Sequence, residues 1–155
     1  MQFQTEQDID APAAYVFARV CNFEAYERQA LRNGAQVTRT DGRGPVVVGA
    51  TWDVAFTFRG KDRQLRAVVT DLIAPESLVV DTDAKGLTSQ TRVSLVALSP
   101  KTTRVSVVVT LAAKSLQARL LLQSLRLAKP RLNKRFRKRI KDQLNTVVTD
   151  YKRGG

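Results

Sequence analysis

Side chains that commonly carry acid–base or nucleophilic chemistry are scarce in this sequence. It contains no histidine and a single cysteine, Cys21. Without histidine, Ser-His-Asp and Cys-His catalysis and the usual histidine-bearing zinc sites are excluded. Cys21 stands beside Asn22 and Phe23, where a small buried apolar role is favoured over that of a nucleophile. We therefore expect no internal disulfide, no metal ion and no cofactor.

Aspartates could still supply acid–base chemistry, but their positions do not form a pair. They fall mostly on polar faces of predicted strands or in turns, and no two have the spacing of a catalytic dyad. The six are Asp8, Asp10, Asp53, Asp62, Asp81 and Asp83. Enzymatic activity stays an open alternative, with no catalytic residues assigned.

Positive charge gathers in the last forty residues. Residues 113–155 carry thirteen Lys and Arg against Asp142 and Asp150, so nearly all of the net charge of +12 lies there. Three interpretations are open. A solvated surface is the commonest role of such a cluster. Attraction to an anionic membrane would contribute about 1 kcal/mol per near-surface cation. Nucleic acid is disfavoured, because no recognised binding module or exposed aromatic platform accompanies the cations.

The same segment predicts a long amphipathic helix. Apolar residues recur every three or four positions, which places them on one helical face: Leu121, Leu125, Leu132, Phe136, Ile140, Leu144, Val147 and Tyr151. The opposite, basic face is predicted to carry Arg131, Lys134, Arg135, Lys138 and Lys141. Pro130 predicts either a kink or two helices, Ser115–Lys129 and Pro130–Tyr151.

The preceding residues predict a β-rich body. Alternation from Phe3 to Ile9 indicates a first strand, and two short helices follow, the second spanning Phe23–Arg32. Turn signals then separate six alternating segments: Gln36–Thr40, Gly49–Arg59, Arg63–Ile73, Leu78–Asp83, Thr88–Leu98 and Thr103–Ala112. This pattern is typical of a meandering antiparallel sheet, whose dry face the terminal helix would cover, with the two short helices covering part of it.

Length and composition predict one soluble domain spanning residues 1–155. The polar, acidic start does not resemble a signal peptide, and the longest apolar run is far short of a membrane span. A cytoplasmic location is therefore expected. The basic helix would also allow peripheral attachment to a membrane.

Several segments together resemble the START/Bet v 1-like helix-grip superfamily, also called SRPBCC, which includes polyketide cyclase/dehydrase-like and coenzyme Q-binding members. They are Ile9-Asp10-Ala11-Pro12, Val16-Phe17, Phe23-Glu24, Val48-Gly49-Ala50-Thr51-Trp52, Phe58-Arg59-Gly60-Lys61 and Ala74-Pro75-Glu76-Ser77-Leu78. The resemblance implies an α+β helix-grip fold: a curved antiparallel sheet of about seven strands wrapped around a long C-terminal helix, with two short helices after the first strand. It also implies a cavity between sheet and helix, but transfers no catalytic residue set.

The predicted cavity walls are the inward residues of the third and later strands and the apolar stripe of the helix opposite. They are Trp52, Val54, Phe56, Phe58, Leu65, Val69, Leu95, Phe136, Ile140 and Leu144. Plain core packing is the alternative for each of them. Arg63 and Thr91 are candidate polar anchors, although Arg63, at a strand end, is expected more readily in solvent than inward.

The favoured function is non-catalytic binding or transport of a hydrophobic small molecule, such as a lipid, quinone or polycyclic compound. One version of this hypothesis places the binding at an anionic membrane surface. One alternative is a cyclase/dehydrase- or hydrolase-like enzyme that uses polar cavity residues. The other is an interaction module that binds acidic partners or nucleic acid through the basic helix. The sequence does not predict the ligand or the oligomeric state.

Overall fold

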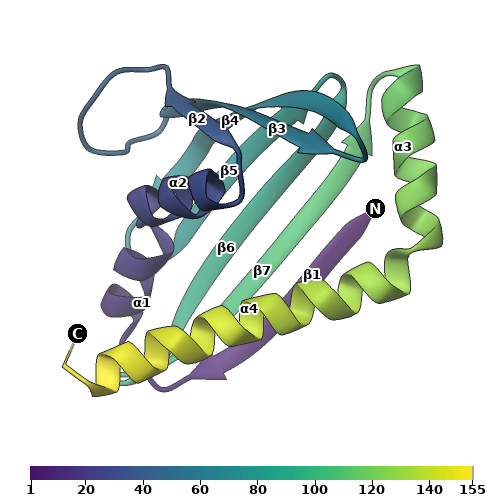
Figure 1. Cartoon of the computed structure of the whole chain (residues 1–155). Coiled ribbons are helices and arrows are strands. Elements are labelled where there is room, and N and C mark those ends of the chain that lie inside the picture. The colour runs from purple at the N-terminus through teal and green to yellow at the C-terminus, as the bar shows by residue number, and fades with distance from the viewer. Residues whose placement is uncertain (155) are drawn as a thin grey trace.

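The computed structural model describes residues 1–154, which form a curved antiparallel sheet and the helices around it (Figure 1). The strands are β1 (Gln2–Ile9), β2 (Gln36–Arg39), β3 (Thr51–Phe58), β4 (Lys61–Ile73), β5 (Ser77–Ala84), β6 (Leu87–Ser99) and β7 (Thr102–Ala113). The helices are α1 (Ala13–Val20), α2 (Phe23–Arg32), α3 (Leu116–Leu127) and α4 (Lys129–Lys152). The predicted fold class and order of elements are confirmed.

The strands follow one another across the sheet in the order β1-β7-β6-β5-β4-β3-β2. Each neighbouring pair is consecutive in sequence except β1 and β7, which join the two ends of the chain's β region. Because side chains alternate between faces, the register places Trp52 beside Ala67 and Val54 beside Leu65 on the concave face. Val69, Leu95 and Val105 are buried at its centre, at 0 %, 5 % and 1 % exposure.

Helix α4 covers the β1 side of this concave face (Figure 1). Phe136 contacts Phe3 of β1, with ring centroids 5.9 Å apart. Near its C-terminal end, Tyr151 packs on Tyr15 of α1 at 5.1 Å. Asp150 accepts a hydrogen bond from Arg19 at 2.8 Å. The far end of α4 is therefore anchored by both aromatic packing and an ion pair.

The expected pairing of α4 with β3 is wrong. Phe23 of α2, not a residue of α4, packs on Trp52, with stacked rings 5.2 Å apart. The sheet is too wide for one helix to cover, so α4 packs along the β1 edge and α2 covers the inner face of β3. Helix α2, which the sequence pattern predicted as only a partial cover, thus lies over β3 in place of the terminal helix.

The C-terminal segment is two helices, as the second alternative at Pro130 predicted. Pro130 lies in the first turn of α4, where a missing backbone N–H costs nothing. Helix α3 packs against β7 and β6. Its first turn is capped by Ser115, whose Oγ accepts a hydrogen bond from Ala118 N at 3.1 Å. Within residues 1–154, no helix is both long enough and apolar enough to cross a membrane.

Candidate functional site

An apolar pocket of about 340 Å³ lies between α2 and the concave face of the sheet. Its wall comes from seven elements: Val20, Phe23, Tyr26, Glu27, Ala30, Val37, Trp52, Val54, Ala67, Leu78, Val80, Thr91 and Val93. The volume is near the lower end of the roughly 300–1,000 Å³ that small-molecule sites occupy. We call this cavity the α2 pocket.

Trp52 forms the firmest part of the α2 pocket wall. Its indole stacks on Phe23 with an interplanar angle of 23°. The guanidinium of Arg39 lies 5.6 Å from its ring centroid, a distance at which a cation is attracted to the aromatic face. The indole Nε1 donates a hydrogen bond to Glu27 Oε1 at 3.2 Å. The ring is thereby held in one orientation at the pocket wall.

Helix α2 contributes four side chains to the α2 pocket, because their spacing in the sequence places them on the same side of the helix. Phe23, Tyr26, Glu27 and Ala30 are three or four residues apart and so lie on one helical face. The helix begins at a clear cap, where Asn22 Oδ1 accepts a hydrogen bond from Ala25 N at 3.2 Å. Sequence reasoning missed these residues, although their spacing was a usable signal.

The polar groups of the α2 pocket are few. Among the described residues that line it, Glu27 is the only carboxylate and Thr91 contributes a hydroxyl. The hydroxyl of Tyr26 donates to Val20 O at 2.6 Å, and burial raises the pKa of Tyr26 to about 12. Tyr26 therefore stays protonated at neutral pH. The pocket offers polar contacts for orientation, but no acid–base pair.

A wider hollow of about 880 Å³ adjoins the α2 pocket, with Phe23, Glu27 and Val37 in both linings. An ion pair organises the loop at its edge. Arg39 donates two hydrogen bonds to the Asp41 carboxylate, at 2.9 and 3.0 Å. These bonds, with one from Thr51 N at 3.0 Å, hold the pKa of Asp41 far below its usual range. Arg39 thus links Trp52 to the conformation of this loop.

Cys21 is half-buried in the turn between α1 and α2, at the border of the wider hollow. Burial raises the pKa of its thiol to about 11, so the thiolate needed for nucleophilic chemistry is scarce at neutral pH. Among residues 1–154, no group of Cys, Asp and Glu is arranged to hold a metal ion.

The structure distributes the predicted cavity residues over several environments. Trp52, Val54 and Thr91 line the α2 pocket. Three others, Val69, Leu95 and Leu144, are buried in the core. Four more, Phe56, Leu65, Phe136 and Ile140, are partly buried outside the α2 pocket.

Phe58 and Arg63 lie away from the α2 pocket, at the end of the sheet where β3 turns into β4. Phe58 was predicted to line the cavity, whereas Arg63 was expected more readily in solvent than inward. Phe58 is 38 % exposed, and the guanidinium groups of Arg59 and Arg63 lie 5.3 and 5.6 Å from its ring centroid. Arg63 Nε donates to Phe58 O at 3.2 Å. The two strands extend past the part of the sheet that α2 covers, so their shared end is open to solvent.

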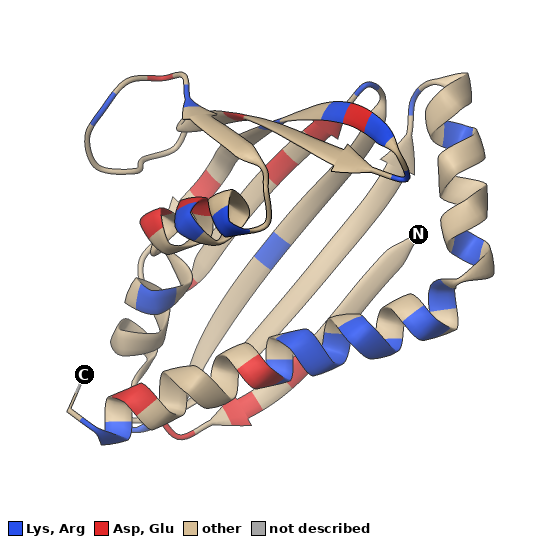
Figure 2. Ribbon diagram, viewed as in Figure 1, with Lys and Arg blue, Asp and Glu red and all other residues tan. Residues whose placement is uncertain are grey.

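The basic surface is concentrated in the first half of α4 (Figure 2). Residues 129–141 contain eight Lys and Arg and no Asp or Glu. All five cations predicted on the basic face, Arg131, Lys134, Arg135, Lys138 and Lys141, are exposed. Arg135 and Lys138 border a groove of about 900 Å³ between α4 and α2, which Gln29 and Asn33 close on the α2 side. Part of the basic face therefore adjoins α2 rather than pointing away from the body.

The sequence matches no protein-family model, and no curated protein matches it significantly. Solved structures are similar in fold over nearly the whole chain. An aromatase/cyclase from Streptomyces has a TM-score of 0.62 at 13% identity, covering 99% of this chain and 94% of its own. A protein from Thermus thermophilus has a TM-score of 0.62 at 13% identity, with coverage of 97% and 99%. A START superfamily protein from Mycobacterium smegmatis has a TM-score of 0.52 at 19% identity, with coverage of 86% and 95%.

These likenesses define the class of fold. The chain has a START/Bet v 1-like helix-grip fold, as its sequence predicted. The fold by itself does not select a ligand or an activity.

Proposed function

We propose that this protein binds a small apolar molecule in the α2 pocket and releases it unchanged. The observation that carries the proposal is the pocket itself, a space of about 340 Å³ whose wall is apolar except for Glu27, Thr91 and the Tyr26 hydroxyl. Removing apolar surface from water supplies affinity at about 25 cal/mol per Å². Binding is favoured over catalysis because the described lining residues include no second carboxylate to act with Glu27.

The lining restricts the ligand further. Glu27 Oε1 accepts a hydrogen bond from Trp52, and the carboxylate has further acceptor capacity for a donor on the ligand. Thr91, on β6, supplies a hydroxyl within the same pocket. A volume of about 340 Å³ suits a bicyclic ring or a short chain better than an entire long-chain lipid. The proposed ligand class is therefore a compact apolar molecule with at least one hydrogen-bond donor, such as a quinol or a small polycyclic alcohol.

Exchange of the ligand takes place, in this proposal, at an anionic membrane surface. The support is electrostatic: the net charge is +12, and eight cations lie within residues 129–141. Near-surface Lys and Arg each contribute about 1 kcal/mol of attraction to an anionic leaflet. An apolar ligand would then pass between membrane and pocket with little time in water.

Trp52 makes the proposal directly testable, because it is the only tryptophan in the chain. After native mass spectrometry and solvent extraction of any bound molecule, the protein is titrated with 2-naphthol, a compact bicyclic alcohol. Calorimetry measures the affinity, and the single indole N–H signal in an NMR spectrum reports on the wall of the α2 pocket. We expect saturable binding that shifts the indole signal.

A pair of variants locates the binding. Val80→Phe places a ring in the α2 pocket, and we expect it to weaken 2-naphthol binding by at least about tenfold, since it displaces the ligand from its apolar contacts. Val96→Phe makes the same change at a position that is 56 % exposed and should leave binding unaltered. Ala30→Leu fills the pocket from α2 and replaces Val80→Phe if that variant fails to fold. Equal affinity in all of these proteins would refute the proposal.

A further inference from the structure

Helix α3 presents a row of leucines to solvent. Leu116, Leu120 and Leu127 are 73 %, 60 % and 89 % exposed. At 100° per residue their positions fall within about 40° of one another on the helix. Ala118 and Leu122, on the opposite side, are 4 % and 6 % exposed. Helix α3 is therefore apolar on two faces, and among the described residues 1–154 nothing covers one of them.

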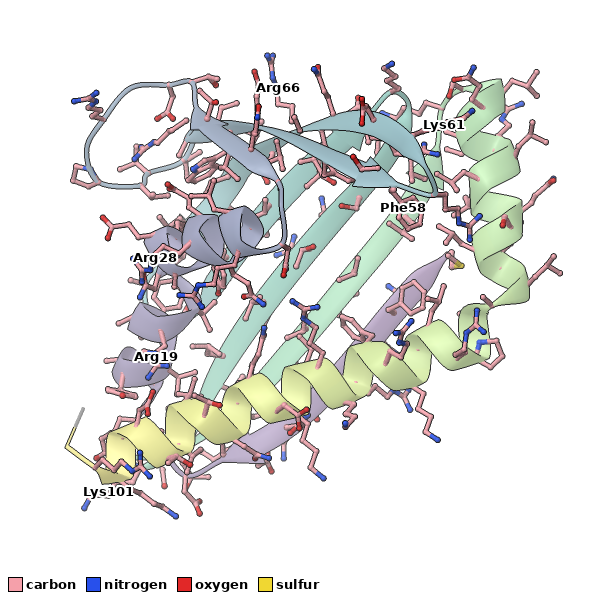
Figure 3. The ribbon with its side chains drawn as sticks, in the orientation of Figure 1. Arg19, Arg28, Phe58, Lys61, Arg66 and Lys101 are labelled. Carbon is pink, nitrogen blue, oxygen red and sulfur yellow. The ribbon has the colours of Figure 1, made fainter. Side chains whose placement is uncertain are left out.

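The β3–β4 turn borders this leucine row. Arg59 of that turn donates a hydrogen bond from Nη1 to Ser124 Oγ of α3 at 2.8 Å. Figure 3 shows Phe58 and Lys61 at the end of the turn that lies beside α3. Phe58 is 38 % exposed. The exposed apolar surface of α3 is thus extended by an aromatic ring and two further cations, Arg59 and Lys61.

Cations surround the leucine row without any carboxylate of α3 or of the adjoining half of α4. Arg119 and Arg126 lie on α3 itself, and α4 continues with the eight cations of residues 129–141. Between residues 84 and 141 the sequence contains no Asp or Glu. Figure 2 shows the consequence: among charged residues, α3 and the first half of α4 carry only Lys and Arg.

We infer that α3, the β3–β4 turn and the first half of α4 form one docking surface for an anionic lipid bilayer. Leu116, Leu120 and Leu127 enter the boundary between headgroups and acyl chains, while the cations around them bind lipid phosphates. Exposed leucines flanked by Lys and Arg are the combination that holds interfacial helices on membranes. The inference deepens the proposed function, and rests on it, by naming the residues at which the protein meets the membrane.

The charge pattern argues against two other occupants of this surface. A second copy of the chain would bring the same cations together without carboxylates to offset them, and like charges at an interface repel. A nucleic acid would satisfy the cations but not the leucines, because phosphate contacts come from polar and charged groups. A bilayer of anionic lipid satisfies both.

Vesicle flotation of the full chain tests the inference. One vesicle population is phosphatidylcholine alone, and the other is an equal mixture of phosphatidylcholine and phosphatidylglycerol. We expect the protein to float with the mixed vesicles only. The triple variant Leu116→Gln, Leu120→Gln, Leu127→Gln should partition at least about tenfold more weakly into them, because it loses the apolar insertion.

A control variant changes three other exposed apolar residues, on β4 and β6. Ile73→Gln, Val96→Gln and Leu98→Gln alter positions that are 51 %, 56 % and 45 % exposed, and together they should leave partitioning unchanged. A second variant, Arg131→Gln, Lys134→Gln, Lys141→Gln, should weaken binding about fivefold per residue and flatten its salt dependence.

Two vesicle results would overturn the inference: equal binding of the leucine variant and the natural protein to mixed vesicles, or equal binding of the natural protein to both vesicle types. So would tighter binding to a DNA duplex than to mixed vesicles, or a dimer that dissociates when the leucines are replaced. Titration with 2-naphthol distinguishes failure of the docking surface from failure of the proposed ligand binding. Loss of vesicle binding with 2-naphthol binding intact removes only the docking surface. Vesicle binding without 2-naphthol binding removes only the pocket assignment.

Discussion

At the scale of single residues, the α2 pocket depends on how Trp52 is held. Its ring is fixed from three directions, by Phe23, by Arg39 and by the hydrogen bond to Glu27. Arg39 is in turn held by Asp41, whose carboxylate also accepts from Thr51 N. The wall of the pocket is therefore coupled to an ion pair that depends on pH.

Replacing Asp41 should change how stability varies with pH. Folding lowers the pKa of Asp41 from its ordinary value of 3.8, so the charged carboxylate stabilises the folded state. This stabilisation is complete at pH values above the unfolded pKa and is lost as the pH falls below that pKa towards the folded one. Asp41→Asn should therefore be less stable than the natural protein at neutral pH, and the difference should shrink as pH falls below about 4. Urea unfolding followed by Trp52 fluorescence at several pH values measures this difference.

A second variant controls for net charge in this experiment. Asp10→Asn removes the same charge at another exposed position and is compared with Asp41→Asn at each pH. A difference between Asp41→Asn and the natural protein that stays constant from neutral to acid pH would contradict the proposed role of the Arg39–Asp41 pair.

At the scale of elements, α3 is placed by the connection that precedes it. Ser115 caps the helix and also donates from Oγ to Lys85 O at 3.0 Å. Lys114 N donates to Gly86 O at 2.7 Å. The β5–β6 turn thereby fixes where α3 starts, and with it the direction of the leucine row.

Gly86 allows Ser115 to approach the β5–β6 turn closely. Its replacement by alanine should therefore lower the free energy of unfolding by more than backbone strain alone would. A Cβ on Gly86 would lie 2.6 Å from Ser115 Oγ, at a φ of +93°. Gly60→Ala is the matched control, with a φ of +73° and open space around the added methyl. We expect Gly60→Ala to lose about 1 kcal/mol of unfolding free energy, and Gly86→Ala about 2 kcal/mol more.

Urea unfolding measures both losses, and hydrogen exchange locates them. Amides of residues 116–127 should exchange faster in Gly86→Ala only, because the steric conflict acts on the start of α3. The interpretation fails if the two alanine variants lose the same stability.

At the scale of the whole molecule, charge is unevenly distributed. Of 26 Lys and Arg, eight lie within residues 129–141, whereas the Asp and Glu are elsewhere in the chain. Ion pairs such as Arg104–Asp8, at 2.9 Å, and Arg66–Asp53, at 3.0 Å, offset charge on the sheet. The cations in the first half of α4 have no acidic neighbours in their own segment, so they repel one another along the helix.

Added salt should therefore stabilise the protein. We expect the melting temperature to rise as sodium chloride increases from low to moderate concentration, since ions screen this repulsion. The variant Arg131→Gln, Lys134→Gln, Lys141→Gln should melt higher at low salt and depend less on salt. Differential scanning calorimetry measures both effects, and a melting temperature that falls with salt in the natural protein would contradict them.

Much of the architecture could be predicted because it depends on local patterns. Alternation in Gly49–Arg59 predicted β3, and the three-to-four spacing of Phe136, Ile140 and Leu144 predicted α4. Pro130 was predicted to allow a break, and the structure has one. The candidate site was only partly predictable, because Trp52, Val54 and Thr91 line the α2 pocket while Phe58 and Arg63 lie outside it.

The sequence alone determined the elements, their order and the sign of the charge, since backbone conformation and amphipathic spacing are properties of neighbouring residues. Only the tertiary structure decided which helix covers which strand, because a sheet face accepts any apolar partner that fits. That choice placed Phe23 on Trp52, Phe136 on Phe3, and the leucine row of α3 in solvent. The α2 pocket and the exposed leucine row both follow from packing between residues that are distant in the chain.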